Sequence, residues 1–333
     1  MEFVKKNYGA VLTKARTLVA EGLTQCDAVM MSVAESAPGG LSTRLSKILE
    51  RKGKRVRSTI LYLVAATGTT QPDPQRAARA AAAIELIHLA SLIHDDVIDA
   101  SQMRRGELTA HYQWGNKIAV LVGDYVLSRS LELVLCDEDR RVPQIVTQAS
   151  GHLVAGEILE TDLSASGEIS YELYLEVIDG KTASLLERCC TLGAILAGHS
   201  PELVQKCAQM GRNFGVAFQM IDDLLDFGLG AEDLGKSTYA DLSNGVLTLP
   251  VILYLDSVSK TEALEFRQLC ARSTEPPVQK QIFSLLQNAG VFIKAQALAT
   301  QRIEAALAVI EELPPTPAAQ HLREMCSAMI FRH

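Results

Sequence analysis

The stretch AARAAAAIELIHLASLIHDDVI, residues 77 to 98, decides the fold of this chain. Its apolar residues recur at three- and four-residue spacing and many of its residues are strong helix formers, so it predicts a long helix. Alanine and leucine stand where a surface helix would carry lysine and glutamate. A helix that is apolar around its circumference belongs in the middle of a bundle, which predicts an all-α protein.

A second segment, ELVQKCAQMGRNFGVAFQMIDDLLDF at 202 to 227, has the same character, and nothing comparable is typical of a strand. Proline and glycine interrupt the helical pattern at 36 to 40, 67 to 74, 228 to 235, 274 to 277 and 313 to 317. The segments between these breaks predict about a dozen helices, with no internal repeat and no low-complexity linker. We therefore expect residues 1 to 333 to form one large helical domain.

The composition excludes several classes of protein. The 333 residues are 48% hydrophobic and 21% charged, which is ordinary for a soluble chain with a large core. Every apolar run is interrupted before the roughly 18 to 20 residues of a membrane span, and the start MEFVKKNYGA lacks the hydrophobic segment of a signal peptide. We expect a cytoplasmic protein. The net charge of −7 argues against nucleic-acid binding, because such surfaces are normally basic.

The seven cysteines contain no CxxC pair, so they predict neither a disulfide framework nor a zinc site. We expect most of them to be small buried apolar residues.

Each of the two apolar helices ends in an acidic cluster with the spacing DDxxD. The clusters are Asp95, Asp96 and Asp99 on the first helix, and Asp222, Asp223 and Asp226 on the second. Residues four apart share a helix face, so like charges at this spacing repel. Aspartate near a helix C-terminus is also disfavoured by the helix macrodipole. Two such clusters therefore require a compensating cation.

Magnesium suits these clusters best. Mg²⁺ prefers oxygen ligands in octahedral geometry and is usually held by one or two carboxylates together with substrate phosphate oxygens. A single DDxxD is more often a solvated helix end, but a pair on apolar helices predicts a phosphorylated substrate bridged by metal between the helices. Calcium of the EF-hand type is excluded, because the loop spacing with its central glycine and terminal glutamate is absent.

Basic residues provide a second set of candidates. Arginine forks and lysine point charges are what a further phosphate group needs if no metal is assigned to it. His88 lies two helical turns before Asp95 on nearly the same face, and Glu85 is one turn further back. Taken singly, these residues could equally be a solvated surface or a core histidine. The basic stretches are RKGKRVR (51 to 57), Arg104-Arg105-Gly106, Lys181-Thr182 and Gly235-Lys236.

Taken together, these motifs resemble the trans-polyprenyl diphosphate synthases of the octaprenyl and heptaprenyl type, which are head-to-tail prenyltransferases of the isoprenoid synthase fold. The resemblance runs from about residue 40 to 250 and implies a large helical bundle around a central cavity. The segments that carry it are GKRVR (53 to 57), ELIHLASLIHDDVIDASQMRRG (85 to 106), GDYVLSR (123 to 129), KTASLLE (181 to 187), FGVAFQMIDDLLDF (214 to 227), LGKSTYADL (234 to 242) and TLP (248 to 250).

The resemblance implies roles for the charged residues. Asp95, Asp99 and Asp222, supported by Asp96, Asp223 and Asp226, are expected to bind about three Mg²⁺ ions and an allylic diphosphate, farnesyl or geranyl diphosphate. The residues expected to hold that same diphosphate are Arg104, Lys181 and Lys236, with Thr182 and Gln219 nearby. Isopentenyl diphosphate is expected on Lys54, Arg55, His88 and Arg105.

The mechanism that the family implies follows from these charges. Metal ions and cations neutralise the departing pyrophosphate, the allylic C–O bond ionises, and the double bond of isopentenyl diphosphate attacks the carbocation. A proton is then lost to the released pyrophosphate. The protein must keep water away from the cation.

The chain departs from the family pattern at three places. It has KGKRVRS where relatives often have GGKRLRP, RRGEL where they have RRGxP, and Gly245-Val246 where they have a lysine after the glycine. The last departure removes a cation near the allylic site. We expect altered diphosphate binding and retained activity, because Lys181 and Lys236 remain.

Product length is predicted from the residues one and two turns before Asp95, where the growing chain is expected to run. Ile87, Ala90 and Ser91 stand there. Short-chain members of the family usually block this path with aromatic residues, whereas alanine and serine leave it open. We predict a product of C30 to C50, with C40 as the best estimate, of the kind used for quinone tails. The tunnel floor is expected to come from deeper residues, for which the helix GHLVAGEILE (151 to 160) is one candidate.

Several alternatives stay open. The product could be short, farnesyl or geranylgeranyl diphosphate. A terpene cyclase would need no isopentenyl diphosphate site, and a non-catalytic subunit of a heteromeric synthase would commonly lack metal-binding aspartates, all six of which are present. A catalytic subunit that needs a partner also fits. The resemblance implies a homodimer, with contacts between residues 100 and 140, and a product that passes to membrane enzymes.

Overall fold

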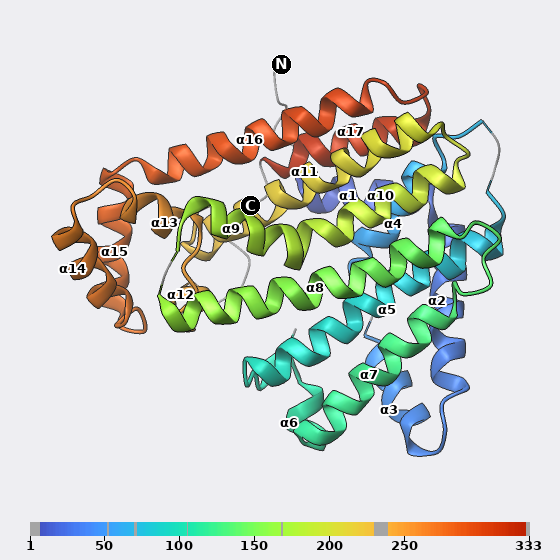
Figure 1. Cartoon of the computed structure of the whole chain (residues 1–333), viewed down its shortest axis with the longest axis horizontal. Helices are drawn as coiled ribbons and strands as arrows, with labels where there is room; N and C mark the ends of the chain where they lie inside the picture. Colours follow the sequence, from blue (N-terminus) through green and yellow to red (C-terminus); the bar gives the residue numbers. More distant parts are fainter. Residues whose placement is uncertain are drawn as a thin grey trace.

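The computed structural model describes residues 7–51, 53–69, 72–104, 106–167, 169–229 and 239–330, with the backbone alone at Ala240. Helices make up nearly all of the regular structure in these ranges, which confirms the predicted all-α class. Figure 1 shows long helices lying side by side along the length of the molecule, with the short helices α12 to α15 gathered at one end.

Helix α5 (Pro74–Ile98) is the predicted central helix. Asp73 begins it by accepting a hydrogen bond from the Arg76 backbone N–H at 2.7 Å, and proline occupies the first turn. Every residue from 80 to 87 is buried, so no face of this stretch reaches solvent. The helix packs against α2 (Ala20–Glu35), α4 (Val56–Ala65) and α7 (Asn116–Glu132).

Helix α11 (Pro201–Asp226) is the second predicted apolar helix. Ser200 caps its N-terminus, and the helix packs against α10 (Ser184–Leu196) and α16 (Val291–Ile310). A Cβ atom at Gly211 would lie 2.5 Å from the Leu186 carbonyl oxygen, so glycine permits the close approach of α10 and α11. Both apolar helices therefore lie in the interior and end at their aspartates.

The remaining elements complete the bundle around these two helices. Before α5 come α1 (Tyr8–Leu18) and α3 (Gly40–Leu49), and after it come α6 (Ala110–Trp114), α8 (Arg141–Ser166) and α9 (Tyr171–Ile178). After α11 come α12 (Ala240–Ser243), α13 (Leu249–Leu255), α14 (Lys260–Cys270), α15 (Pro276–Asn288) and α17 (Pro317–Met329).

A short antiparallel pair, β1 (Met103–Arg104) and β2 (Glu107–Leu108), follows the first acidic cluster and pairs Met103 with Leu108. No pattern in the sequence predicts this pair, because a two-residue strand is too short to show a periodic pattern.

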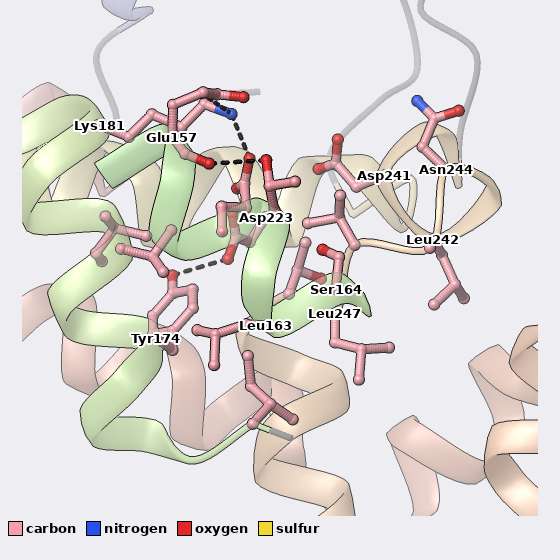
Figure 2. Close-up of a pocket in the computed structure, with 18 of the residues that line it drawn as sticks. Glu157, Leu163, Ser164, Tyr174, Lys181, Asp223, Asp241, Leu242, Asn244 and Leu247 are labelled. Atoms are coloured by element: carbon pink, nitrogen blue, oxygen red, sulfur yellow. Dashed lines mark hydrogen bonds and ion pairs between the residues drawn. The ribbon is translucent and has the colours of Figure 1, made fainter. Parts of the chain in front are cut away.

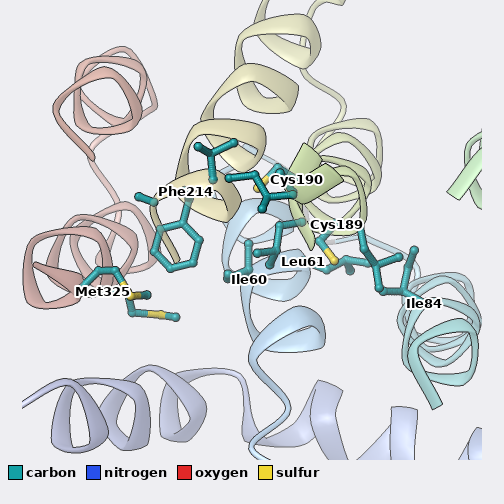
Figure 3. Packing of buried hydrophobic residues seen from close by; sticks show 14 of the residues in the cluster. Ile60, Leu61, Ile84, Cys189, Cys190, Phe214 and Met325 are labelled. Atoms are coloured by element: carbon teal, nitrogen blue, oxygen red, sulfur yellow. The ribbon is translucent and has the colours of Figure 1, made fainter. Parts of the chain in front are cut away.

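The cysteines lie where the sequence analysis placed them. All seven are free thiols, and only Cys136 is exposed. Figure 3 shows Cys189 and Cys190 in the same buried cluster as Ile60, Leu61 and Phe214.

No single helix among the described ranges is both long and apolar enough to cross a membrane. The pair α15 and α16, bent by 65°, reaches that length and hydropathy only when the two helices are taken together.

A turn of π-helix, η1 (Asp179–Ala183), joins α9 to α10 and packs tightly on α8. A Cβ atom at Gly156 of α8 would lie 2.7 Å from the Lys181 backbone nitrogen, and one at Gly180 would lie 2.9 Å from the Gly156 Cα atom. The two glycines therefore let Lys181 reach the surface of α8. Single π-turns of this kind occur frequently at functional sites.

We predict that Gly156→Ala lowers the free energy of unfolding by about 1–3 kcal/mol, because the added methyl group meets backbone atoms that cannot move aside. Gly151→Ala is the matched control on the same helix. Gly151 is exposed and its added methyl group meets nothing, so this change should raise stability by up to about 1 kcal/mol. Urea unfolding of both variants measures the difference, and equal effects would contradict the predicted close contact.

Candidate metal and diphosphate site

A pocket of about 560 Å³ opens where the two apolar helices end. Asp99 from the first acidic cluster and Asp223 from the second both line it, together with Lys181 of η1. Figure 2 shows Lys181 and Glu157 on one side of this pocket and Asp241 of α12 on the other. The fold therefore brings both predicted clusters and the predicted lysine to one cavity.

Two glutamates of α8 hold Lys181. The Lys181 Nζ atom lies 3.0 Å from Glu157 Oε2, and it also forms an ion pair with Glu160. Burial acts to lower the pKa of Lys181, but the two carboxylates raise it above its ordinary value. The lysine is therefore held as a cation at the pocket wall.

Negative charge is crowded around this lysine. Burial, followed by the charge of Glu157, raises the pKa of Asp95 to about 7, although Lys181 acts in the opposite direction. Burial also raises the pKa values of Asp99 and Glu160. A bound cation would relieve this repulsion and keep the carboxylates ionised.

Magnesium fits the oxygen donors of the site. Within the described ranges, no three His, Cys, Asp or Glu side chains are grouped closely enough to hold an ion by themselves. Carboxylate oxygens from two helices are ligands of the kind Mg²⁺ prefers, and Mg²⁺ usually completes its coordination with waters and substrate phosphate oxygens. Asp95 and Asp99 of α5 and Asp222 of α11 are the residues that would hold it.

Asp96 is the most buried member of the first cluster. It is 5% exposed, and its Oδ1 atom accepts a hydrogen bond from Arg104 Nε at 2.7 Å. Asp96 therefore positions Arg104, which is the cation predicted to bind the allylic diphosphate. Arg104 remains 38% exposed and can still reach a ligand.

Asp223 is the inward-facing member of the second cluster. Its Oδ2 atom accepts hydrogen bonds from the Tyr174 hydroxyl at 2.8 Å and the Leu249 N–H at 3.1 Å. Its Oδ1 atom accepts one from Gln219 Nε2 at 3.0 Å. Burial raises the pKa of Asp223 to about 7 against the effect of these donors. Asp223 thus joins α9, α11 and α13, while Asp222 and Asp226 are half-buried on the same turn.

Thr182 and Gln219, both predicted near the diphosphate, lie together. The Thr182 hydroxyl donates to Gln219 Oε1 at 2.9 Å, and Gln219 in turn donates to Asp223. This chain of hydrogen bonds connects η1 to the second acidic cluster. Because Thr182 follows Lys181 in η1, these hydrogen bonds help hold the backbone of Lys181 in place.

The predicted isopentenyl diphosphate residues lie at the start of α4 and in the middle of α5. Lys54 is exposed and His88 is half-buried. The Arg55 side chain, in contrast, is 11% exposed and pairs with Asp27 and Glu85. The guanidinium of Arg55 is thus engaged by carboxylates of α2 and α5. Two further predicted cations, Arg105 and Lys236, lie outside the described residues.

The predicted chain-length residues occupy the helix upstream of Asp95. Ile87 and Ala90 are 1% and 2% exposed, and Ser91 is half-buried with its hydroxyl donating to the His88 carbonyl at 2.9 Å. Val246, where relatives often have lysine, lines the pocket.

Sequence reasoning missed four residues of the site. Glu157, Glu160, Tyr174 and Asp241 all line the pocket. The available signal was the pair of glutamates three residues apart in GEILE, a spacing that places both on one helix face. That segment is also the candidate for the tunnel floor, and its two acids lie beside Lys181.

We predict that Tyr174→Phe lowers the free energy of unfolding by about 1–3 kcal/mol, because it removes one hydrogen-bond donor from the buried Asp223 carboxylate. Tyr171→Phe serves as the control, since this half-buried ring stacks on Tyr174. Its effect should stay within about 0.5 kcal/mol. Urea unfolding in the absence of metal compares the two variants, and an equal loss in both would show that Asp223 does not depend on the hydroxyl.

Comparison with known proteins agrees with this geometry. Residues 40–286 match the polyprenyl synthetase family. The chain is 33% identical over 304 residues to an all-trans-nonaprenyl-diphosphate synthase (geranyl-diphosphate specific) of Rhodobacter capsulatus, covering 91% of this chain and 89% of the relative. It is 31% identical over 306 residues to the octaprenyl diphosphate synthase of Escherichia coli, covering 92% and 94%.

A solved structure shares the fold as well. A polyprenyl synthase from Caulobacter crescentus, complexed with calcium and isoprenyl diphosphate, superposes with a TM-score of 0.86 at 29% identity, covering 96% of this chain and 98% of that one. The two acidic clusters, the shared pocket and these similarities lead to one conclusion. The chain belongs to the polyprenyl synthetase family and is an enzyme that makes a polyprenyl diphosphate.

Proposed function

We propose that this chain joins an allylic diphosphate, farnesyl or geranyl diphosphate, to successive isopentenyl diphosphates and releases a long all-trans polyprenyl diphosphate. The observation that supports this most directly is the pocket shared by Asp99 and Asp223, with Lys181 in its wall. Carboxylates from two helices and a lysine suit a diphosphate bridged by magnesium ions, of which the family pattern implies about three.

The residues around the pocket divide the work of binding. Asp95, Asp99 and Asp222 would hold the ions, and bound Mg²⁺ supplies positive charge that stabilises the leaving pyrophosphate. Lys181 donates to the allylic diphosphate, for which it must leave Glu157 and Glu160.

Arg104, bound by Asp96, adds a second cation whose charge acts on Asp95 and Asp99. The roles predicted for Lys236 and Arg105 remain part of the proposal.

The protein contributes charge stabilisation and the exclusion of water. The allylic C–O bond breaks with its electron pair leaving on pyrophosphate, the double bond of isopentenyl diphosphate attacks the carbocation, and the proton lost from the adduct passes to pyrophosphate. Apolar side chains of the pocket, among them Ile98, Val177 and Leu247, limit access of water to the cation.

We propose a product near C40, within C30 to C50, of the kind used for quinone tails. The small side chains of Ala90 and Ser91, which lack the aromatic rings that usually block this path in short-chain members, support a long product. The relatives with octaprenyl and nonaprenyl products support a long chain. The candidate segment for the tunnel floor, residues 151 to 160, belongs to helix α8.

We also propose a cytoplasmic homodimer whose product passes to membrane enzymes. Large apolar side chains are exposed on neighbouring helices, with Leu121 of α7 at 53% and Val154 and Ile158 of α8 at 55% and 57%. Exposed apolar side chains on these two helices support an association site there. The molar mass in solution, measured by light scattering, distinguishes a dimer from a monomer.

The first experiment incubates the purified protein with Mg²⁺, farnesyl diphosphate and isopentenyl diphosphate. We expect a ladder of products that ends at one long prenyl diphosphate, identified by mass after dephosphorylation, and its loss in Asp95→Ala, which removes a proposed metal ligand. A farnesyl or geranylgeranyl end product would contradict the long-chain assignment. No elongation with any starter would favour a missing partner subunit and overturn activity of the chain alone.

We predict that Ser91→Phe shortens the product, because an aromatic ring one turn before Asp95 would block the path of the growing chain. Ser91→Ala keeps the side chain small and should leave the product length unchanged. Mass analysis of the dephosphorylated products compares both variants with the wild type. An active Ser91→Phe enzyme with the wild-type product would show that the chain does not pass this residue.

A further inference from the structure

Arg55 has an unusual backbone conformation for its residue type. Its φ of 53° and ψ of 37° lie in the left-handed region, which residues other than glycine seldom adopt. It stands at the N-terminus of α4, directly after Lys54, and its carbonyl accepts the Thr59 N–H at 3.0 Å to begin the helix. Such a conformation persists only where surrounding contacts hold it.

The contacts that hold it are two acidic side chains. The Arg55 Nη2 atom lies 2.8 Å from Asp27 Oδ1 on α2, and Nη1 lies 3.3 Å from Glu85 Oε2 on α5. Burial acts to lower the pKa of the Arg55 guanidinium, but Glu85 and Asp27 raise it above its ordinary value. Both carboxylates are thus bound to an arginine that stays charged in a largely buried position.

Glu85 also grips the first turn of α4. Its Oε1 atom accepts hydrogen bonds from the Ser58 N–H at 3.0 Å and the Ser58 hydroxyl at 2.8 Å. One carboxylate on α5 therefore holds the start of α4 through both Arg55 and Ser58. Glu85 is one helical turn before His88 on α5, and Lys54 directly precedes Arg55. The same contacts therefore set the distance between Lys54 and His88.

We propose that Arg55, Asp27 and Glu85 form a positioning triad that presents Lys54 and His88 to isopentenyl diphosphate, and that Arg55 does not itself touch the substrate. The inference rests on the proposed function, because it takes Lys54 and His88, which the family resemblance implies, as the residues that bind isopentenyl diphosphate. The Arg55 guanidinium is bound by Asp27 and Glu85, so the triad would act by holding the backbone at Lys54 and Arg55 in place.

Two variants separate positioning from direct binding. Asp27→Asn weakens the triad but keeps Arg55, and Arg55→Gln removes the arginine itself. If the triad positions the site, each variant raises the KM for isopentenyl diphosphate by roughly 10- to 100-fold, as small misplacements of binding groups do. The KM for farnesyl diphosphate stays within about twofold, and the double variant resembles the single ones because the residues act as one unit.

Direct binding would give the opposite pattern. Arg55→Gln alone would raise the KM for isopentenyl diphosphate, while Asp27→Asn would leave it unchanged or lower it by releasing the arginine, and this result would overturn the proposal. If Arg55→Gln fails to fold, as judged by circular dichroism, Asp27→Asn carries the test alone, because Asp27 is the more exposed partner.

Asp137→Asn is the matched control. Asp137 forms a similarly buried pair with Arg76, at 2.9 Å between Arg76 Nε and Asp137 Oδ2, away from the proposed substrate site. It should lower the melting temperature without changing the KM for isopentenyl diphosphate. An equal rise in that KM would show that the triad variants act through general loss of stability, which would overturn the positioning role.

Calorimetric titration with isopentenyl diphosphate keeps this inference distinct from the proposed function. If the wild type binds the compound but elongates nothing, the proposed reaction fails, and the Kd values of the same variants still test the triad by the same pattern. If the wild type does not bind isopentenyl diphosphate at all, both the proposed function and the triad's role in it are overturned.

Discussion

The constraint on which this structure depends is the repulsion among carboxylates that several helices bring to one buried pocket. Asp95 and Asp99 on α5 lie near Glu157 on α8, and burial with mutual repulsion raises the pKa of Asp95 to about 7. Lys181 offsets part of that charge. Side chains under such repulsion would move apart on a flexible backbone, so the helices that carry them must be held rigidly.

Rigid support comes from apolar packing and close backbone contacts. Interior helices packed to crystalline density resist small displacements, and α5 and α11 are both interior helices. Gly156 and Gly180 add a backbone contact that no larger residue permits, and this contact places the π-turn of Lys181 against α8. The same packing that stabilises the core therefore also sets the geometry of the charged site.

Charged motifs in this chain divide between residues that face the pocket and residues that hold the protein together. Adjacent residues on a helix point about 100° apart, so neighbouring aspartates cannot share a face. Asp96 is buried and binds Arg104, whereas Asp223 does both, because it lines the pocket and accepts hydrogen bonds from α9 and α13. Arg55 and Lys54 show the same difference between neighbours. The Arg55 guanidinium pairs with Asp27 and Glu85 inside the protein, and Lys54 is exposed.

The sequence by itself determined the helical class, the two interior helices and the acidic clusters at their ends, because helix periodicity and local composition are short-range properties. Only the tertiary structure decided which charged residues lie near one another: it placed Glu157 and Glu160 beside Lys181, and Asp27 and Glu85 beside Arg55. These outcomes depend on contacts between segments far apart in the chain. Such contacts are set by how helices cross and pack, which no local pattern of residues contains.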